Sequence, residues 1–257
     1  DKFGGMTGMD GFKPGGENAA FPTDHMEEGF SKVIEYTEWR DSFSVSRKAA
    51  DDGNIIDLKK RPLGFIAGYF RTREKFAASI FGAAMSGVTA HKFGGMTFDL
   101  KCADGKGLFA TDHPSKLGKS KQCNVFSDEF NEDSLGALET AMQNFMGDND
   151  EILDISPDTI VIPNDHALKK AVFAAIGSDK DPSTSNNGFN YHYGRWNIIV
   201  HPYLNQFITK STKPWMLLDS NANKAYDGAV WGDRVSLEVE SRIDAGTKAN
   251  VWDGYAR

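Results

Sequence analysis

The sequence predicts an α+β fold, with helices and strands placed irregularly along the chain. Three observations lead to this class: one long amphipathic stretch, two shorter helix candidates after it, and short apolar strand candidates at unequal distances. Evenly alternating strands and helices would instead indicate a doubly wound parallel sheet. The 257 residues are enough to bury one large core or two intergrown ones.

The strongest helix candidate spans residues 54–90. Phe65 and Tyr69 begin a series of apolar residues at helical spacing, with charged residues between them. Pro62 would cost about 3 kcal/mol inside a helix, so we expect the regular part to begin or bend there. The glycine pair at 94–95 is expected to end the element.

Residues 1–26 contain many Gly, Pro and Met-Gly turns in a short space. This composition is too rich in breakers for a helix and too hydrophobic for a pure linker. It predicts an N-terminal arm that becomes ordered by lying on another surface.

Residues 27–50 predict an extended loop in the form of a β-hairpin, built from the runs 30–36 and 41–49. A helix in the first of these runs is an alternative. In the second run Phe43 and Val45 alternate with serines, which is the period of a strand with one wet face. A hairpin of two strands is marginal alone and would need a partner surface.

The rest of the chain predicts a series of shorter elements. Asp104-Gly105 marks a turn between two strands within 96–126. Asn131 with Asp133 is the candidate cap of one helix, and Asn164 or Asp165 that of the next. The helices are expected at 131–146 and 164–176, and further strands at 158–163, 195–204, 215–220 and 235–243.

Composition and charge exclude several classes of protein. Hydrophobic residues make up 40% and charged residues 25%, which is ordinary for a globular chain. The net charge is −7 and no basic run stands out, so a dedicated nucleic-acid binder is not expected. No apolar run is long enough to span a membrane. The two cysteines, without a CxxC pair, favour a reducing compartment over a disulfide-stapled secreted scaffold.

The only cluster that suggests catalysis is the sequence at 108–115. Asp112, His113 and Ser115 lie close together there, and a hydrolase using His113 with one of the other two is an alternative function. Neighbours in sequence seldom satisfy triad geometry, and a turn with Asp112 capping local N–H groups is the preferred interpretation. Phosphate-binding loops and the usual hydrolase motifs are absent. We therefore expect no catalytic residue and no bound cofactor.

Four possible metal ligands follow one another at nearly even intervals: His91, Cys102, His113 and Cys123. Structural zinc sites usually take two ligands from one tight turn, and these four lie apart. Two buried thiols and two surface histidines are the preferred interpretation, so no metal site is expected.

An ordered series of segments resembles a known family. The segments are RTREKFAASIFGAAM (71–85), ADGKGLFATDHPS (103–115), SPDTIVIPNDHALKKAVFAAIG (156–177), GRWNIIVHPYLN (194–205) and PWMLLDS (214–220). In this order they resemble the Mu-like major head subunits among the tailed-bacteriophage major capsid proteins. The resemblance covers nearly the whole chain from about Glu27.

The resemblance implies the Hong Kong ninety-seven-type capsid fold. It assigns residues 1–26 to an N-terminal arm and 27–50 to the extended loop. Residues 51–130 would form a peripheral domain with the long spine helix, 131–213 an axial domain, and 214–257 the return strands of the peripheral domain.

The function that the resemblance implies is that of a major capsid subunit. Such a subunit assembles with itself as pentamers and hexamers in the bacterial host cytoplasm, and the resulting icosahedral virion shell encloses DNA without sequence-specific binding. Scaffold, portal and decoration proteins are possible partners, and no membrane is involved. An encapsulin-like nanocompartment shell is the nearest alternative.

We expect Trp39, Phe43 and Val45 on the predicted hairpin to contact a neighbouring subunit, because exposed aromatic side chains on a lone hairpin would otherwise be a liability.

Overall fold

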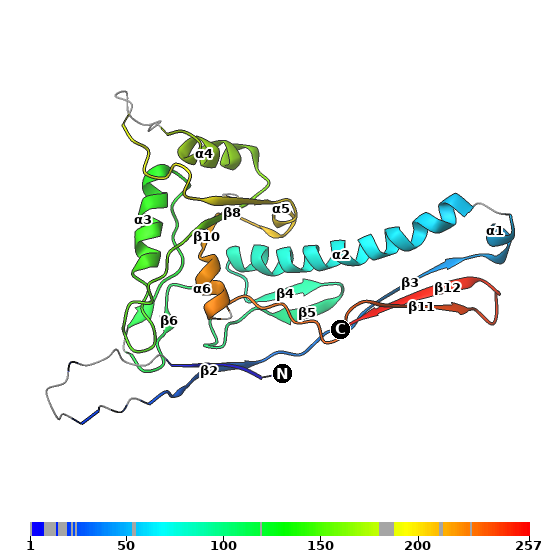
Figure 1. Ribbon diagram of the computed structural model, residues 1–257, viewed down its shortest axis with the longest axis horizontal. Helices are drawn as coiled ribbons and strands as arrows, with labels where there is room; N and C mark the ends of the chain where they lie inside the picture. The colour runs from blue at the N-terminus through cyan, green and yellow to red at the C-terminus, as the bar shows by residue number, and fades with distance from the viewer. Residues whose placement is uncertain are drawn as a thin grey trace. The chain divides into compact units, whose positions relative to one another are not determined.

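The computed structural model describes residues 2–7, 14, 20–21, 23, 25–52, 55–118, 120–179, 188–210, 213–226 and 228–257 (Figure 1). The contacts within the chain divide it into two units, which we describe separately. Unit 1 contains residues 34–75 and 229–257, and unit 2 contains residues 2–33 and 76–228. The division differs from the predicted domain boundaries, chiefly because residues 76–130 and 214–228 belong to unit 2.

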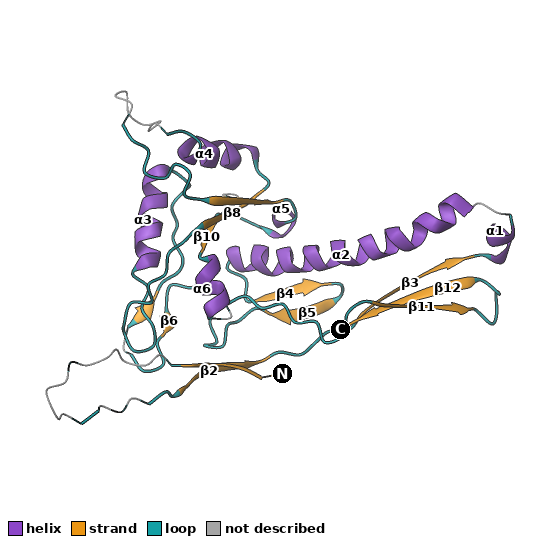
Figure 2. Cartoon of the chain, viewed as in Figure 1, coloured by secondary structure: helices purple, strands orange, loops and turns teal. Residues whose placement is uncertain are grey.

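Unit 1 is a helix packed on a three-stranded antiparallel sheet (Figure 2). The sheet has the order β11-β12-β3, in which β12 (Asn250–Ala256) lies between β11 (Glu238–Ile243) and β3 (Trp39–Val45). The short helix α1 (Arg47–Asp51) follows β3, and its N-terminus is capped by Ser46. Residues from both ends of the chain therefore share one sheet.

Aromatic side chains join the sheet of unit 1 to helix α2 (Ile55–Met85). Phe43 of β3 stacks on Trp252 of β12, with ring centroids 4.9 Å apart. Phe65 of α2 lies 5.1 Å from the Phe43 ring. Gly254 is required at this contact, because a Cβ there would lie 2.6 Å from the Phe65 ring. These contacts fix which side of α2 faces the sheet.

Helix α2 confirms the predicted long helix but differs from it at both ends. It begins at Ile55 and continues through Pro62, so the helix does not start at this proline. It ends at Met85, well before the glycine pair. The N–H groups of Gly87 and Val88 bond back to the carbonyls of Ala84 and Ala83, with Gly87 at a φ of 78°, which is a Schellman end.

The glycine pair at 94–95 forms a turn instead of a helix end. Strand β4 (Ala90–Phe93) pairs with β5 (Met96–Asp99) across it, and both glycines have positive φ. Two consecutive residues with positive φ suit a tight antiparallel hairpin. The pair was therefore correctly identified as a breaker and assigned to the wrong element. The next predicted turn, at Asp104-Gly105, is confirmed by the bridge between Lys101 and Gly107.

The predicted hairpin over 27–50 is wrong. Strand β2 (Glu28–Val33) pairs with β1 (Lys2–Met6), while β3 pairs with β12. The sequence between β2 and β3, Ile-Glu-Tyr-Thr-Glu, has no Gly, Pro, Asn or Asp to form a tight turn. The helix alternative for the first run is also wrong. The predicted arm contributes β1, and most of residues 8–24 lie outside the described part of the chain.

Unit 2 is centred on the buried strand β8 (Thr159–Pro163). In the order β10-β8-β9, β8 pairs in parallel with β9 (Asn197–His201) and antiparallel with β10 (Met216–Leu218). Because β10 belongs to this sheet, residues 214–228 do not return to the other unit as predicted. Ile160 and Ile162 are fully buried and pack with Leu135 and Val172 from the two main helices.

The helices of unit 2 confirm two predicted elements. Helix α3 (Glu132–Gln143) begins with a capping box between Asn131 and Ser134. Helix α4 (His166–Ile176) is capped by Asp165 and ends at Gly177. The remaining elements are short: β6 (His113–Pro114), β7 (Lys121–Gln122), α5 (Leu204–Phe207) and α6 (Ser220–Ala225).

Candidate subunit interface

The cluster around His113 does not form a catalytic triad. The His113 Nδ1 atom lies 2.6 Å from Asp104 Oδ2, while Asp112 forms an ion pair with Lys106. The Ser115 hydroxyl donates to the carbonyl of Asp148 at 2.9 Å, and this places it in a loop contact. The three residues therefore have separate structural partners, and no base is positioned to activate the serine.

The four possible metal ligands are also not assembled. Among the residues that the structure describes, no group of three or more His, Cys, Asp or Glu side chains could hold a metal ion. Cys102 and Cys123 are both free and partly buried. Burial raises the pKa of the Cys102 thiol, which keeps it protonated and unreactive. Among the described residues, no helix is long and apolar enough to cross a membrane.

The three predicted contact residues lie on one strand, β3, with different surroundings. Val45 is 2% exposed, and Phe43 packs on Trp252 and Phe65 of its own chain. Trp39 is partly exposed and is paired with Ala256 of β12 in the sheet. Val45 and Phe43 are therefore not exposed on a lone hairpin, which was the reason for predicting them as contacts. Contact with a neighbouring subunit stays a prediction, and Trp39 is the member best placed for it.

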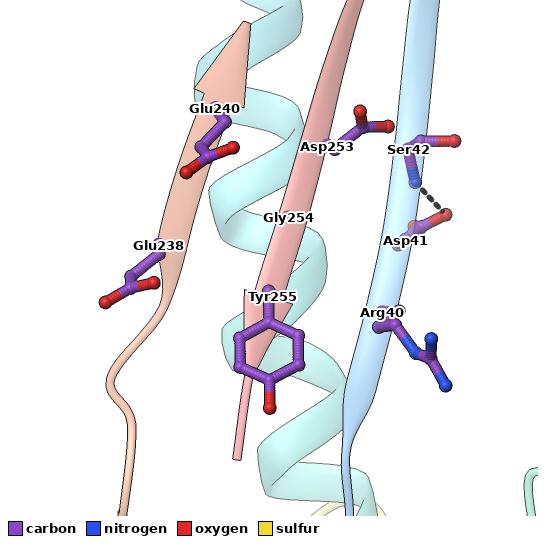
Figure 3. A pocket seen from close by; sticks show the side chains of 8 residues that line it. All are labelled: Arg40, Asp41, Ser42, Glu238, Glu240, Asp253, Gly254 and Tyr255. Atoms are coloured by element: carbon purple, nitrogen blue, oxygen red, sulfur yellow. Dashed lines mark hydrogen bonds between the residues drawn. The ribbon is translucent and has the colours of Figure 1, made fainter.

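The sheet of unit 1 carries a charged outer face (Figure 3). Figure 3 shows α2 behind the sheet and the side chains of Glu238 and Glu240 on its near side. Asp253 on the same face accepts a hydrogen bond from Arg242, with Nε and Oδ2 2.6 Å apart. This contact raises the pKa of the Arg242 guanidinium. Glu238 and Glu240 have no ion-pair partner among the described residues. The face is a shallow polar surface that suits contact with a charged neighbour.

Helix α2 leaves large apolar side chains uncovered in unit 1. Leu63 is 70% exposed, Phe70 55% and Ile66 37%. Ile66 and Phe70 also line a groove of about 390 Å³ beside Leu237 and Val239. Exposed apolar side chains that are contiguous mark interaction surfaces in soluble proteins.

Unit 2 has a buried charge network, formed by Glu139, Arg195 and His192. Glu139 of α3, 3% exposed, accepts a hydrogen bond from Arg195 at 2.6 Å, and the Arg195 guanidinium lies over the ring of Tyr191. His192 is also buried, and its Nδ1 accepts from the Trp196 indole at 3.3 Å. Burial lowers the pKa of His192, so the ring is neutral at pH 7.

The aromatic side chains beside this network are exposed. Phe189 is 83% exposed, Tyr191 57% and Tyr193 50%. Neither these residues nor the exposed side of α2 was predicted from the sequence. Each was a detectable signal: closely spaced aromatic residues in a polar segment, and a second apolar spacing on α2 beside the one that begins at Phe65.

Comparison with known proteins gives one family match. The family model described as phage capsid protein matches residues 37–257. No curated protein matches the chain significantly.

Solved structures give the same fold at low sequence identity. The bacteriophage JBD30 capsid is similar with a TM-score of 0.55 and 13% identity, covering 80% of this chain and 86% of that one. A second structure, the JBD30 capsid decorated with minor capsid protein trimers, gives 0.51 and 14%, covering 80% and 85%. At this identity the likeness shows the fold: the chain has the Hong Kong ninety-seven-type capsid fold expected from its sequence.

Proposed function

Because the chain belongs to the phage capsid protein family, we propose that copies of it associate into the closed icosahedral head shell that encloses phage double-stranded DNA. The chain is a major capsid protein, a structural component of the virion capsid and not an enzyme. The Mu-like assignment within the family stays a prediction. What the proposal adds to the family assignment is the mode of self-association and the cargo.

The observation that carries self-association is the ribbon formed by β1 and β2. All five residues of β1 are exposed, including Phe3 at 41% and Met6 at 67%. Among the described strands, β1 pairs only with β2. Lys32 joins β2 to Asp99 of the same chain, but a two-stranded ribbon with exposed apolar side chains has only marginal stability of its own in water. A neighbouring subunit would supply the surface on which this ribbon becomes ordered, and the ribbon would then bury area that no single subunit can.

The ribbon replaces the predicted hairpin as the extended loop of the subunit. On this proposal unit 1 is the peripheral domain, unit 2 apart from β1 and β2 is the axial domain, and the ribbon of β1 and β2 reaches to the neighbour. Rings of five and six copies are heterologous assemblies, since each copy presents one surface to the next and the ring closes by rotation. Scaffold, portal and decoration proteins, and assembly in the host cytoplasm, stay predictions.

The charge of the chain fits enclosure of DNA rather than binding to it. The net charge is −7, and the exposed face of the sheet presents Glu238 and Glu240 without ion-pair partners among the described residues. A protein that binds nucleic acid tightly needs a concentrated basic surface. An acidic subunit also stays soluble at the high concentration that assembly requires.

The alternatives are not favoured. The matching family and the similar structures are phage capsids, which does not favour an encapsulin-like nanocompartment. A hydrolase using His113 would need Asp112 or Ser115 beside it, and both are engaged elsewhere. Replacing His113 should therefore affect local stability and reveal no loss of an enzymatic activity.

Negative-stain electron microscopy of the purified protein, expressed with its neighbouring genes, tests the proposal. Closed polyhedral particles or rings of five and six are the expected result. The double variant Phe3→Ser with Met6→Ser should lose particles while keeping its thermal unfolding transition, because both side chains are exposed in the subunit. Met96→Ser is the matched control, since Met96 is also exposed, at 53%, on a different hairpin. A monodisperse monomer or dimer under every assembly condition would contradict the proposal.

A further inference from the structure

Helix α2 has a regular exposed seam, one member of which, Phe70, also borders the groove beside Leu237 and Val239. Its members recur at alternating intervals of three and four residues, which is the spacing of a helix face that packs along another helix. Phe65, which contacts the sheet, lies on the opposite side of the helix, as the helical repeat requires. The seam consists of Lys60, Leu63, Ala67, Phe70 and Glu74, all exposed.

A glycine beside the seam is not explained by the subunit alone. Glycine in a helix interior costs about 1 kcal/mol relative to alanine. A Cβ added at Gly64 would meet nothing within 4 Å, so no contact with the described residues requires this glycine. Small residues at Gly64 and Ala67 would allow a second helix to approach closely. The absence of a Cβ then has a reason outside the subunit.

The seam is complementary to itself when a second copy runs antiparallel. Lys60 and Glu74 are equally far from Ala67 along the helix, so a two-fold axis at Ala67 would place each lysine opposite the glutamate of the other copy. Leu63, four residues before Ala67, would lie within one residue of Phe70 of the other copy, three residues after it, also twice. An isologous contact of this kind uses one patch on both subunits. Opposite charges at its two ends favour the antiparallel direction over the parallel one.

We propose that α2 pairs antiparallel with α2 of a second copy, across a two-fold axis at Ala67. The inference rests on the proposed self-assembly and names one contact within it. The partner is a second copy, because the same short face supplies both halves of the charge and apolar complementarity. An unrelated partner would have no reason to match the sequence symmetry about Ala67.

Disulfide trapping at the axis tests the pairing directly. Ala67→Cys places a thiol opposite its own counterpart, within the 4.4–6.8 Å range of Cα separations that a disulfide spans. We expect most chains in mildly oxidised Ala67→Cys particles to migrate as covalent dimers. Thr72→Cys, exposed on the same helix but off the seam, should give no more dimer than the wild type, whose own Cys102 and Cys123 set the background. Equal dimer from Ala67→Cys and Thr72→Cys overturns the inference.

A charge exchange gives an independent test. Lys60→Glu and Glu74→Lys each place like charges opposite one another at both ends of the contact, and each should lower particle yield, roughly fivefold. The double variant restores opposite charges and should recover wild-type yield. A mixture of the two single variants should also recover, since each supplies what the other lacks. A double variant as defective as either single variant overturns the pairing.

The outcomes separate this inference from the proposed function. If the wild type forms particles but Ala67→Cys gives no dimer, the pairing is wrong and self-assembly stands. If the wild type forms no particles, the proposed function fails, and the pairing fails with it. A third outcome is that Phe70→Glu abolishes particles while Ala67→Cys particles give no covalent dimer. In that case another part of the neighbour or a scaffold-type partner covers the face, which also overturns the pairing. Thermal unfolding of each variant verifies that the subunit is folded.

Discussion

The two halves of α2 use small residues for different reasons. In unit 2 the helix is buried, and a Cβ at Gly82 would lie 2.8 Å from Phe207 Cβ. In unit 1 a Cβ at Gly64 would meet nothing, and Leu63 beside it is 70% exposed. The first glycine is explained by the chain's own packing. The comparison teaches that one helix can be a core element at one end and a subunit surface at the other.

The largest effect is expected at the buried half. Gly82→Leu forces a side chain into the space occupied by Phe207, and overpacking of this kind lowers the free energy of unfolding by about 1–3 kcal/mol. Chemical denaturation of the purified subunit measures it. Gly82→Ala, with a smaller insertion, should lose less, and an unchanged midpoint for the leucine variant would refute the packing account.

A similar but smaller loss is expected where the helix meets its sheet. Gly254→Ala places a Cβ 2.6 Å from the ring of Phe65, which must move from its position against Phe43. We expect about 1–2 kcal/mol lower stability. Relief should follow if Phe65 is replaced by Leu in the same chain, because the smaller side chain leaves room. If the second substitution gives no relief, the clash is not the cause.

The exposed half should respond in the opposite direction. Gly64→Ala meets no neighbour and should raise the stability of the isolated subunit by about 0.5–1 kcal/mol, through the better helix propensity of alanine. The same substitution should reduce particle yield, since a methyl group is added beside the seam, where the second copy approaches. A loss of subunit stability would mean that Gly64 has an intrachain role.

The smallest effect is a pH dependence confined to unit 2. Burial lowers the pKa of His192 below its ordinary 6.5, so the unfolded chain takes up this proton first as pH falls. Stability from this site is therefore complete above pH 6.5 and declines from there down to the folded pKa. The facing charged groups are Glu139, which favours the protonated ring, and Arg195, which opposes it. His192→Gln should flatten this part of the profile, and an identical pH profile in the variant would exclude His192 as its origin.

The sequence was sufficient for elements that are determined locally. Helices α3 and α4 each begin at one of the two cap candidates that the sequence indicated, Asn131 and Asp165, and the apolar run of β8 lies in the core as expected. These signals are carried by a few neighbouring residues and do not depend on the rest of the chain.

Pairing between distant strands could not be predicted in the same way. The alternation of Phe43 with serines indicated a strand, but it cannot tell whether the partner is β2 or β12. Trp252 supplies the matching aromatic side chain from the other end of the chain. The exposed seam on α2 could have been found from its spacing, but which of two apolar spacings faces the core depends on what packs against the helix.

The placement of β3 against β12 also has a kinetic consequence. Trp39–Val45 pair with Asn250–Ala256, so this pairing joins segments about 200 residues apart in the sequence, whereas the central sheet of unit 2 is built from β8, β9 and β10, all between Thr159 and Leu218. Contacts between distant segments form slowly and require the complete polypeptide. During synthesis we therefore expect unit 2 to acquire structure on the ribosome before β12 has been made, while the sheet of unit 1 forms only after it. The surfaces that we assign to association on unit 1 would then appear only once β12 has been made, and this order would keep shorter nascent chains from joining a growing shell.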